Sequence, residues 1–179
     1  MSVRRWLAWS ALVVASGLVV GSSPTAQPPA PVTRLAHQQQ MQQSELQQRF
    51  DQAVLMLHAR QYEHAATALY RVLELAPAMP EAHVNMGYTL LGLKRGDAAR
   101  GFFLSAIELR PDQANAYYGL AMAEEQRADL IAALGGMRSY LHLARADAPH
   151  RERARAALWE WEEALGRHKP GAASAPVMR

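Results

Sequence analysis

Residues 80–113 read PEAHVNMGYTLLGLKRGDAARGFFLSAIELRPDQ, and their pattern is the main evidence for the architecture of the chain. It contains two segments with the composition of helices, at about 80–93 and 96–109, and Pro111 closes the pair. Gly87 and Ala99 are small residues within these segments, and small residues allow two helix backbones to approach closely. The stretch therefore predicts a helical hairpin.

The hairpin recurs along the chain at an interval of 34 residues. Ala65, Ala99 and Ala133 follow one another at this interval, and Pro77 and Pro111 do so once. The same register predicts helices at about 45–58, 62–75, 80–93, 96–109, 114–126 and 130–143. We expect the hairpins to form a stack, because each can bury its apolar face only against a neighbour and would not be stable alone.

In this pattern the sequence resembles the tetratricopeptide repeat family. The resemblance is clearest in residues 80–113, where Gly87, Ala99, Phe103, Ala106 and Pro111 stand at the motif's positions. It extends over residues 44–147 as repeats at about 46–79, 80–113 and 114–147. It implies an all-α, right-handed α-solenoid of three hairpins, followed by a capping helix at 148–167. The small residues expected to pack the repeats together are Ala65, Gly87, Ala99, Ala106 and Ala133.

The third repeat departs from this pattern. Arg145 replaces the closing proline, and Tyr140 occupies a position that is usually small. Gly135 and Gly136 lie inside the second helix, where a glycine costs about 1 kcal/mol. We expect this hairpin to be the loosest of the three. In the capping helix, Trp159 falls off the apolar stripe, and we expect its side chain to be exposed.

The N-terminal segment has the layout of an export signal. Arg4 and Arg5 precede an uncharged apolar run from Trp6 to Val20. The run is long for a signal peptide and short for a membrane-spanning helix, so residues 1–23 are predicted to be either a cleaved signal peptide or a single transmembrane anchor formed by residues 6–23. Both outcomes place the rest of the chain outside the cytoplasm, in the periplasm if the cell is bacterial. Contact with a membrane is expected only through this segment.

Residues 24–43 are predicted to be a proline-rich linker and a glutamine-rich lead. The prolines between Pro24 and Pro31 remove N–H donors and helical dihedrals, which favours a solvated spacer. Ser44 and Gln47 match a capping box, so the first packed helix is expected to begin near Glu45. At the other end of the chain, residues 168–179 are expected to form a disordered tail.

The charge of the chain argues against nucleic acid as a partner. The sequence contains 19 basic and 16 acidic residues, and without Arg4 and Arg5 the balance is 17 to 16. Phosphate binding requires a clustered basic footprint, and no stripe of basic residues interleaved with aromatics occurs. The absence of cysteine excludes disulfides, thiolate metal sites and a cysteine nucleophile.

The resemblance also implies a binding surface. In the family, the first helices of the repeats line a concave groove that holds a peptide or helix of a partner protein. The corresponding positions here are Phe50, Val54, Leu57, Val84, Asn85, Tyr88, Leu91, Tyr118, Met122 and Glu125. Tyr88 and Tyr118 are the expected anchors, and their hydroxyls and Asn85 are expected to hydrogen-bond the partner's backbone. For any single member of this set, packing between hairpins is an equally good interpretation.

Recognition of a chaperone's C-terminal tail is not predicted. The family's clamp for a terminal carboxylate uses basic and Asn side chains, and only Asn85 fits one of its positions. Phe50, Val54, Asn115 and Gly119 occupy the others.

The sequence contains no arrangement that predicts catalysis, a cofactor or a metal ion. The seven histidines give no workable ligand spacing, and Glu124 and Glu125 face different ways on a helix. We therefore expect a non-enzyme that acts as an extracytoplasmic adaptor or assembly factor, with a layout similar to anchored repeat proteins of cytochrome c maturation. The alternative is a permanent structural subunit of a secretion, pilus or polysaccharide-export complex. The partner's identity and the oligomeric state stay open.

Overall fold

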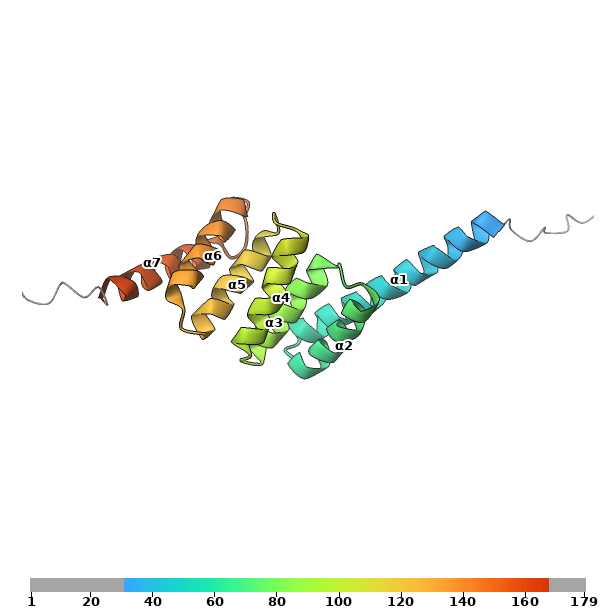
Figure 1. Ribbon diagram of the computed structural model, residues 1–179, viewed down its shortest axis with the longest axis horizontal. Helices are drawn as coiled ribbons and strands as arrows, with labels where there is room; N and C mark the ends of the chain where they lie inside the picture. The colour runs from blue at the N-terminus through green and yellow to red at the C-terminus, as the bar shows by residue number, and fades with distance from the viewer. Residues whose placement is uncertain (1–30, 168–179) are drawn as a thin grey trace, which may run out of the picture.

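The computed structural model describes residues 31–167, and this part of the chain folds into seven helices without a strand (Figure 1). They are α1 (Pro31–His58), α2 (Tyr62–Leu75), α3 (Pro80–Gly92), α4 (Gly96–Leu109), α5 (Ala114–Gln126), α6 (Leu130–Leu143) and α7 (Arg151–Arg167). The prediction of an all-α solenoid is confirmed. The predicted bounds of α2 to α6 agree with the structure to within one residue.

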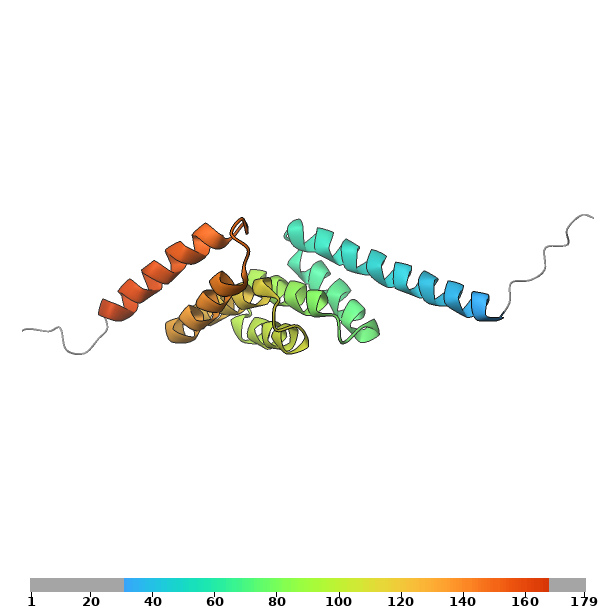
Figure 2. The same ribbon diagram turned by 90° about the horizontal axis from the view of Figure 1, so that it is seen from above.

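The helices form two layers. Each helix packs against the next along the chain, and α3 also contacts α1 and α5. The first helices of successive hairpins are therefore neighbours, and α1, α3 and α5 form an inner layer with α2, α4 and α6 outside it. Figure 2 shows the ends of this stack, where α1 and α7 project from the body in opposite directions. We call the exposed side of α1, α3 and α5 the inner face.

Each hairpin turns on a residue in the left-handed conformation. Arg60, Lys94 and Ala128 have φ angles of 59°, 62° and 61°, and they stand 34 residues apart. Side chains with a Cβ adopt this conformation infrequently, and glycine is the residue usually found there. The repeat therefore specifies the backbone of its turn, although three different residues occupy the position.

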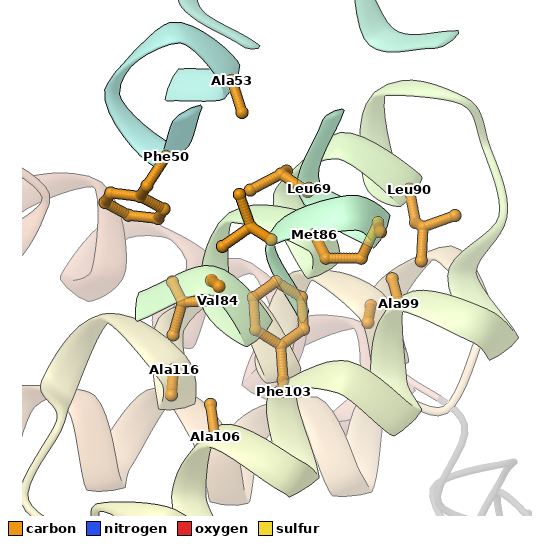
Figure 3. Packing of buried hydrophobic residues seen from close by; sticks show 13 residues of the cluster. Phe50, Ala53, Leu69, Val84, Met86, Leu90, Ala99, Phe103, Ala106 and Ala116 are labelled. Carbon is orange, nitrogen blue, oxygen red and sulfur yellow. The ribbon is translucent and has the colours of Figure 1, made fainter. Parts of the chain in front are cut away.

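Phe103 of α4 lies between two glycines of the inner layer. Its side chain is fully buried, and Figure 3 shows it among the side chains of neighbouring helices. A Cβ atom on Gly87 of α3 would lie 2.6 Å from Cζ of Phe103, and one on Gly119 of α5 would lie closer still. The phenyl ring therefore occupies the space of two missing side chains and holds α3, α4 and α5 together. The five residues predicted to pack the repeats are all buried.

A buried carboxylate ties α4 to α5. The side chain of Glu124 is 5% exposed and accepts hydrogen bonds from Nε of Arg100, at 2.7 Å, and from Arg127. Arg127 also donates to Asp97 at the start of α4, and its hydrogen bonds to Asp97 and Glu124 raise its pKa. Glu124 is thus a buried charge that two partly exposed arginines compensate.

The first helix begins earlier than the sequence predicts. Helix α1 starts at Pro31 and passes through Ser44, so the interpretation of Ser44 and Gln47 as a capping box is wrong. Glutamine, leucine, methionine and alanine are good helix formers, and the packed half of α1 supplies the nucleus from which the helix extends. Between Arg34 and Glu45 every side chain is exposed. Residues 24–30 of the predicted linker lie outside the described part of the chain.

The N-terminal edge of the stack is open. Positions 48, 52 and 55 of α1 correspond to positions 82, 86 and 89 of α3, one repeat later. In α3 these residues are buried against α2, whereas Gln48, Gln52 and Leu55 are exposed, Leu55 to 61%. The face with which later first helices contact the preceding hairpin is therefore uncovered in α1.

The C-terminal end is closed by α7, which begins three residues later than predicted. Its connection to α6 spans seven residues, 144–150, whereas four residues connect α2 to α3 and α4 to α5. Trp161 is 4% exposed and packs against the third hairpin, while Trp159 is 69% exposed, as predicted.

None of the helices within residues 31–167 has the length and apolar character needed to cross a membrane. The predicted signal or anchor and the predicted tail lie outside these residues.

Candidate partner-binding face

The ten predicted groove residues lie on the three helices of the inner layer, but their burial differs. Phe50 and Val84 are 9% and 5% exposed and belong to the hydrophobic core. Glu125 is exposed, and the other seven are partly buried. Phe50 and Val84 therefore offer little surface to a partner, and the surface that remains comes from the partly buried side chains.

Tyr88 holds α3 against α5. Its hydroxyl donates to the main-chain oxygen of Asn115 at 2.8 Å, and its ring meets the ring of Phe103 edge-on with centroids 5.1 Å apart. Burial raises the pKa of Tyr88, and the nearby Tyr118 and Tyr140 raise it further. The single proton of this hydroxyl is therefore bound within the stack, and toward a partner's backbone the oxygen can act only as an acceptor.

Tyr118 belongs to an aromatic cluster at the C-terminal end of the inner face. Its ring stacks on His150 with centroids 4.8 Å apart and meets Tyr140 edge-on at 5.1 Å. Burial raises the pKa of Tyr118, an effect that the charge of Arg153 partly offsets. The 144–150 connection thus reaches back over the predicted anchor and leaves it partly buried.

Two polar groups of the predicted set have different roles. The carboxylate of Glu125 accepts a hydrogen bond from Nε1 of Trp161 at 3.1 Å, which ties α7 to α5. The side-chain amide of Asn85 makes no hydrogen bond with any residue between 31 and 167. Asn85 is therefore a polar group of the inner face that can donate and accept toward a partner.

The apolar surface of the inner face is contributed by four partly buried side chains, Val54, Leu57, Leu91 and Met122. Val54 and Leu91 pack on the core of the first two hairpins, and Met122 packs on the core of the third. Leu57 belongs to neither core cluster. We call these four side chains, together with the Asn85 amide, the apolar strip; they lie on α1, α3 and α5.

The sequence did not identify three residues that complete this face. Tyr140, His150 and Trp161 contact the predicted residues from α6, α7 and their connection. Tyr140 was detectable as a large residue at a small position of the repeat. No local signal in the sequence marks His150 or Trp161 as contacts of α5, because their placement depends on the path of the 144–150 connection.

Two of the pockets in the described part of the chain are relevant here, and both lie outside this strip. One, of 710 Å³, lies between the N-terminal half of α1 and the end of α2 and is lined by Gln39, Gln42, Gln43, Glu45, Leu46, Arg49 and Leu75. The second, of 460 Å³, lies at the start of α5 beside the 144–150 connection. None of the ten predicted groove residues lines either pocket.

Metal-ligating side chains do not gather in the described part of the chain. Between residues 31 and 167, no three His, Asp or Glu side chains are placed to hold one ion. Two of the histidines contact other residues of the stack instead. Nε2 of His83 lies 2.8 Å from the main-chain oxygen of Pro77, at hydrogen-bond distance. The ring of His150 stacks on the ring of Tyr118.

A comparison with family models assigns the central hairpins. Residues 56–124 match the model described as tetratricopeptide repeat. This stretch belongs to the tetratricopeptide repeat family. The match runs from the end of α1 to α5, and the tetratricopeptide hairpin continues in α6 at the same 34-residue interval. No curated protein sequence matches the chain.

Solved tetratricopeptide repeat structures have the same fold. The chaperone SycD of the type III secretion system of Yersinia enterocolitica, in complex with a peptide of the translocator YopD, is 15% identical with a TM-score of 0.63, over 68% of this chain and 95% of that one. The first repeat domain of Spaghetti (RPAP3), bound to an HSP90 peptide, is 18% identical with a TM-score of 0.63, over 69% and 94%. The corresponding domain of Arabidopsis OM64 is 17% identical with a TM-score of 0.62, over 67% and 96%.

Proposed function

We propose that this protein is a non-catalytic interaction module that binds a peptide or helix of a partner protein along its inner face. The tetratricopeptide repeat fold supports this function, since SycD and Spaghetti are described in complex with peptides. The observation that carries the proposal is the set of partly buried apolar side chains of the inner layer, Val54, Leu57, Leu91 and Met122, together with the unpartnered amide of Asn85. The partner supplies apolar side chains to this strip and main-chain groups to the amide.

The energetics of this strip fit a segment with spaced apolar side chains. Burial of apolar surface contributes about 25 cal/mol per Å² removed from water. An amide that both donates and accepts can pair with the backbone of any sequence, whereas the apolar strip selects for side-chain spacing. Affinity therefore comes from the partner's apolar residues, and Asn85 fixes the position of its main chain.

Inner-face substitutions are expected to weaken partner binding by at least about tenfold. A photoreactive phenylalanine analogue at Met122 first captures the partner in intact cells, and mass spectrometry identifies it. Titration of that partner then compares the wild type with a Leu57→Glu, Asn85→Ala variant. Leu57 is suitable because it belongs to neither core cluster, so the variant is expected to keep the wild-type Tm.

Ile131 provides the matched control for this experiment. It lies on α6 in the outer layer and is 74% exposed. The analogue at Ile131 is expected to capture no common partner, and Ile131→Glu is expected to leave the affinity unchanged. Equal capture from both positions, or equal affinity of all three proteins, overturns the inner face as the binding surface.

We further propose that the module works outside the cytoplasm as an adaptor or assembly factor of an envelope complex, of which cytochrome c maturation is one example. The charge and apolar pattern of residues 4–20 supports this location. Alkaline phosphatase fused after Arg167 is expected to be active in bacterial cells, and deletion of residues 4–20 is expected to abolish that activity. Activity that survives the deletion contradicts the location.

A permanent structural subunit is the second candidate, and the open N-terminal edge favours it. Leu55 and its neighbours are uncovered on a surface that later hairpins bury. The same capture experiment separates the candidates, because an adaptor releases its partner on dilution and is soluble alone. A permanent subunit is expected to co-purify with its neighbour and to self-associate when isolated.

A further inference from the structure

Two pockets at the N-terminal edge of the stack share an ion pair. One, of 710 Å³, lies between α1 and the end of α2, and the other, of 410 Å³, lies between α1 and the middle of α2. Glu45 and Arg49 line both, and Arg71 is the one other charged residue in their described linings. Arg49 donates to Glu45 at 2.7 Å, and both side chains are exposed. The pair therefore lies on the open surface of α1.

The rest of this surface is rich in neutral amides. The larger pocket is lined by Gln39, Gln42 and Gln43, and the smaller by Gln48 and Gln52. A side-chain amide both donates and accepts, so one glutamine can pair with another. A surface of amides with one pair of opposite charges is therefore complementary to a second copy of itself.

One face of α1 carries this surface along the helix. Met41, Glu45, Gln48, Gln52 and Leu55 follow one another at spacings of four and three residues, which places them on the same side of a helix. Met41 and Leu55 are 59% and 61% exposed. The face therefore has an apolar side chain at each end and polar side chains between them. It runs from residues 31–45, which project from the body, into the uncovered edge of the first hairpin (Figure 2).

The two ends of the stack favour a closed pair of molecules over an open chain of them. Helix α7 covers the C-terminal end, where Trp161 is buried against the third hairpin. The N-terminal edge is uncovered, so the two ends do not offer matching surfaces for head-to-tail contact. Contact of one surface with the same surface on a second copy forms a dimer with two-fold symmetry.

The charges determine the direction in which two copies of α1 run. In a parallel pair Glu45 would face its own copy and Arg49 would face its own copy, and like charges repel. In an antiparallel pair with the two-fold axis near Gln48, Glu45 lies beside Arg49 of the other copy. The same arrangement places Met41 opposite Leu55 of the other copy, since both are seven residues from Gln48.

We infer that the protein forms a symmetric dimer in which the α1 helices of two copies pack antiparallel through this face. The projecting half of each α1 then lies along the uncovered edge of the other copy. A helix of about 15 residues is marginal in water without tertiary contacts, so the pairing also stabilises the projecting half. The inference goes beyond the proposed function, because the inner face is not used.

Arg49→Glu is expected to raise the dimerisation Kd at least about tenfold, because it brings like charges together across the axis. Sedimentation equilibrium of the full-length chain in a density-matched mild detergent measures the Kd. The double variant Glu45→Arg, Arg49→Glu exchanges the charges and keeps the antiparallel match, so it is expected to restore the wild-type Kd. Arg138→Glu is the control, because Arg138 pairs with Glu162 at 2.7 Å on an exposed surface away from α1. A monomeric wild type, or no recovery in the double variant, overturns the inference.

Disulfide cross-linking tests the antiparallel direction. The chain contains no cysteine, so each introduced cysteine is unique. Gln48→Cys is expected to give a cross-linked dimer on mild oxidation. Met41→Cys alone and Leu55→Cys alone are expected to give none, because each residue lies about 21 Å along the helix from its own copy and a disulfide requires Cα atoms within about 7 Å. A mixture of these two variants is expected to cross-link. A dimer of Met41→Cys alone, or no product from Gln48→Cys and from the mixture, overturns the arrangement.

The outcomes separate the dimer from the proposed function. The Leu57→Glu, Asn85→Ala variant is expected to keep the wild-type dimerisation Kd, and Arg49→Glu is expected to keep the affinity for the captured partner. If the inner-face variant is monomeric while Arg49→Glu still dimerises, the copies associate through the inner face and this inference fails. The proposed function is tested by the partner titration alone.

Discussion

Phe103→Ala is expected to lower the free energy of unfolding by about 3–5 kcal/mol, out of the roughly 5–15 kcal/mol typical of a folded domain. The ring is fully buried between Gly87 and Gly119, so its removal leaves a cavity shared by three helices. The neighbouring helices cannot close this space, because each is fixed by its next hairpin. Urea unfolding followed by circular dichroism measures the loss.

The effect of Gly119→Ala on stability is expected to have opposite signs in the wild type and in the Phe103→Ala variant. In the wild type, Gly119→Ala is expected to be destabilising by about 1–3 kcal/mol, because the new methyl group overlaps the Phe103 ring. In the Phe103→Ala background the same methyl group enters the cavity and is expected to stabilise. Gly135→Ala is the control, since its Cβ meets nothing within 4 Å and is expected to stabilise by about 0.5–1 kcal/mol. Equal effects of Gly119→Ala on stability in both backgrounds would contradict the packing of the Phe103 ring between Gly87 and Gly119.

The second large effect is expected from the two arginines that surround Glu124. An Arg100→Ala, Arg127→Ala variant leaves a carboxylate that is 5% exposed without a compensating charge, at a cost of about 3–5 kcal/mol. Glu124→Ala is expected to cost less, about 1–3 kcal/mol, because the arginine side chains are 44% and 34% exposed and return to water. The measurement is the free energy of unfolding of each variant.

The control for this comparison is a surface pair of the same chemistry. Arg138 and Glu162 lie 2.7 Å apart with side chains 62% and 51% exposed. Arg138→Ala is expected to change stability by less than about 1 kcal/mol. The prediction is wrong if Glu124→Ala lowers the free energy of unfolding more than the Arg100→Ala, Arg127→Ala variant does. Loss of the carboxylate's interactions would then cost more than burying the carboxylate without a compensating charge.

The positions of the helices could be read from the 34-residue interval because packing between hairpins recurs with it. Small residues such as Ala99 and Ala133 mark the places where helices touch, and their spacing is preserved by the stack. The start of α1 could not be read in this way. The side chains from Arg34 to Glu45 are exposed, so the packing interval carries no information there, and the local signal at Ser44 had no effect on the helix.

The candidate site was only partly accessible to the sequence. Repeat positions placed the predicted residues on the inner layer, but they could not show which polar atoms were already paired. The Tyr88 hydroxyl binds Asn115, 27 positions away, and Glu125 binds Trp161, 36 positions away. Both contacts depend on the angle between successive hairpins and on the path of the 144–150 connection. These are properties of the assembled stack.

The two ends of this stack differ in their capacity for enlargement. At the N-terminal edge, Gln48, Gln52 and Leu55 are exposed at the positions with which a later first helix contacts the preceding hairpin. At the C-terminal end, Tyr140 and the long connection have replaced the residues with which a following hairpin would dock. A duplication or an engineered insertion can therefore lengthen the array only from its beginning. Added hairpins would increase the reach of the inner face and leave the chemistry of its far end unchanged.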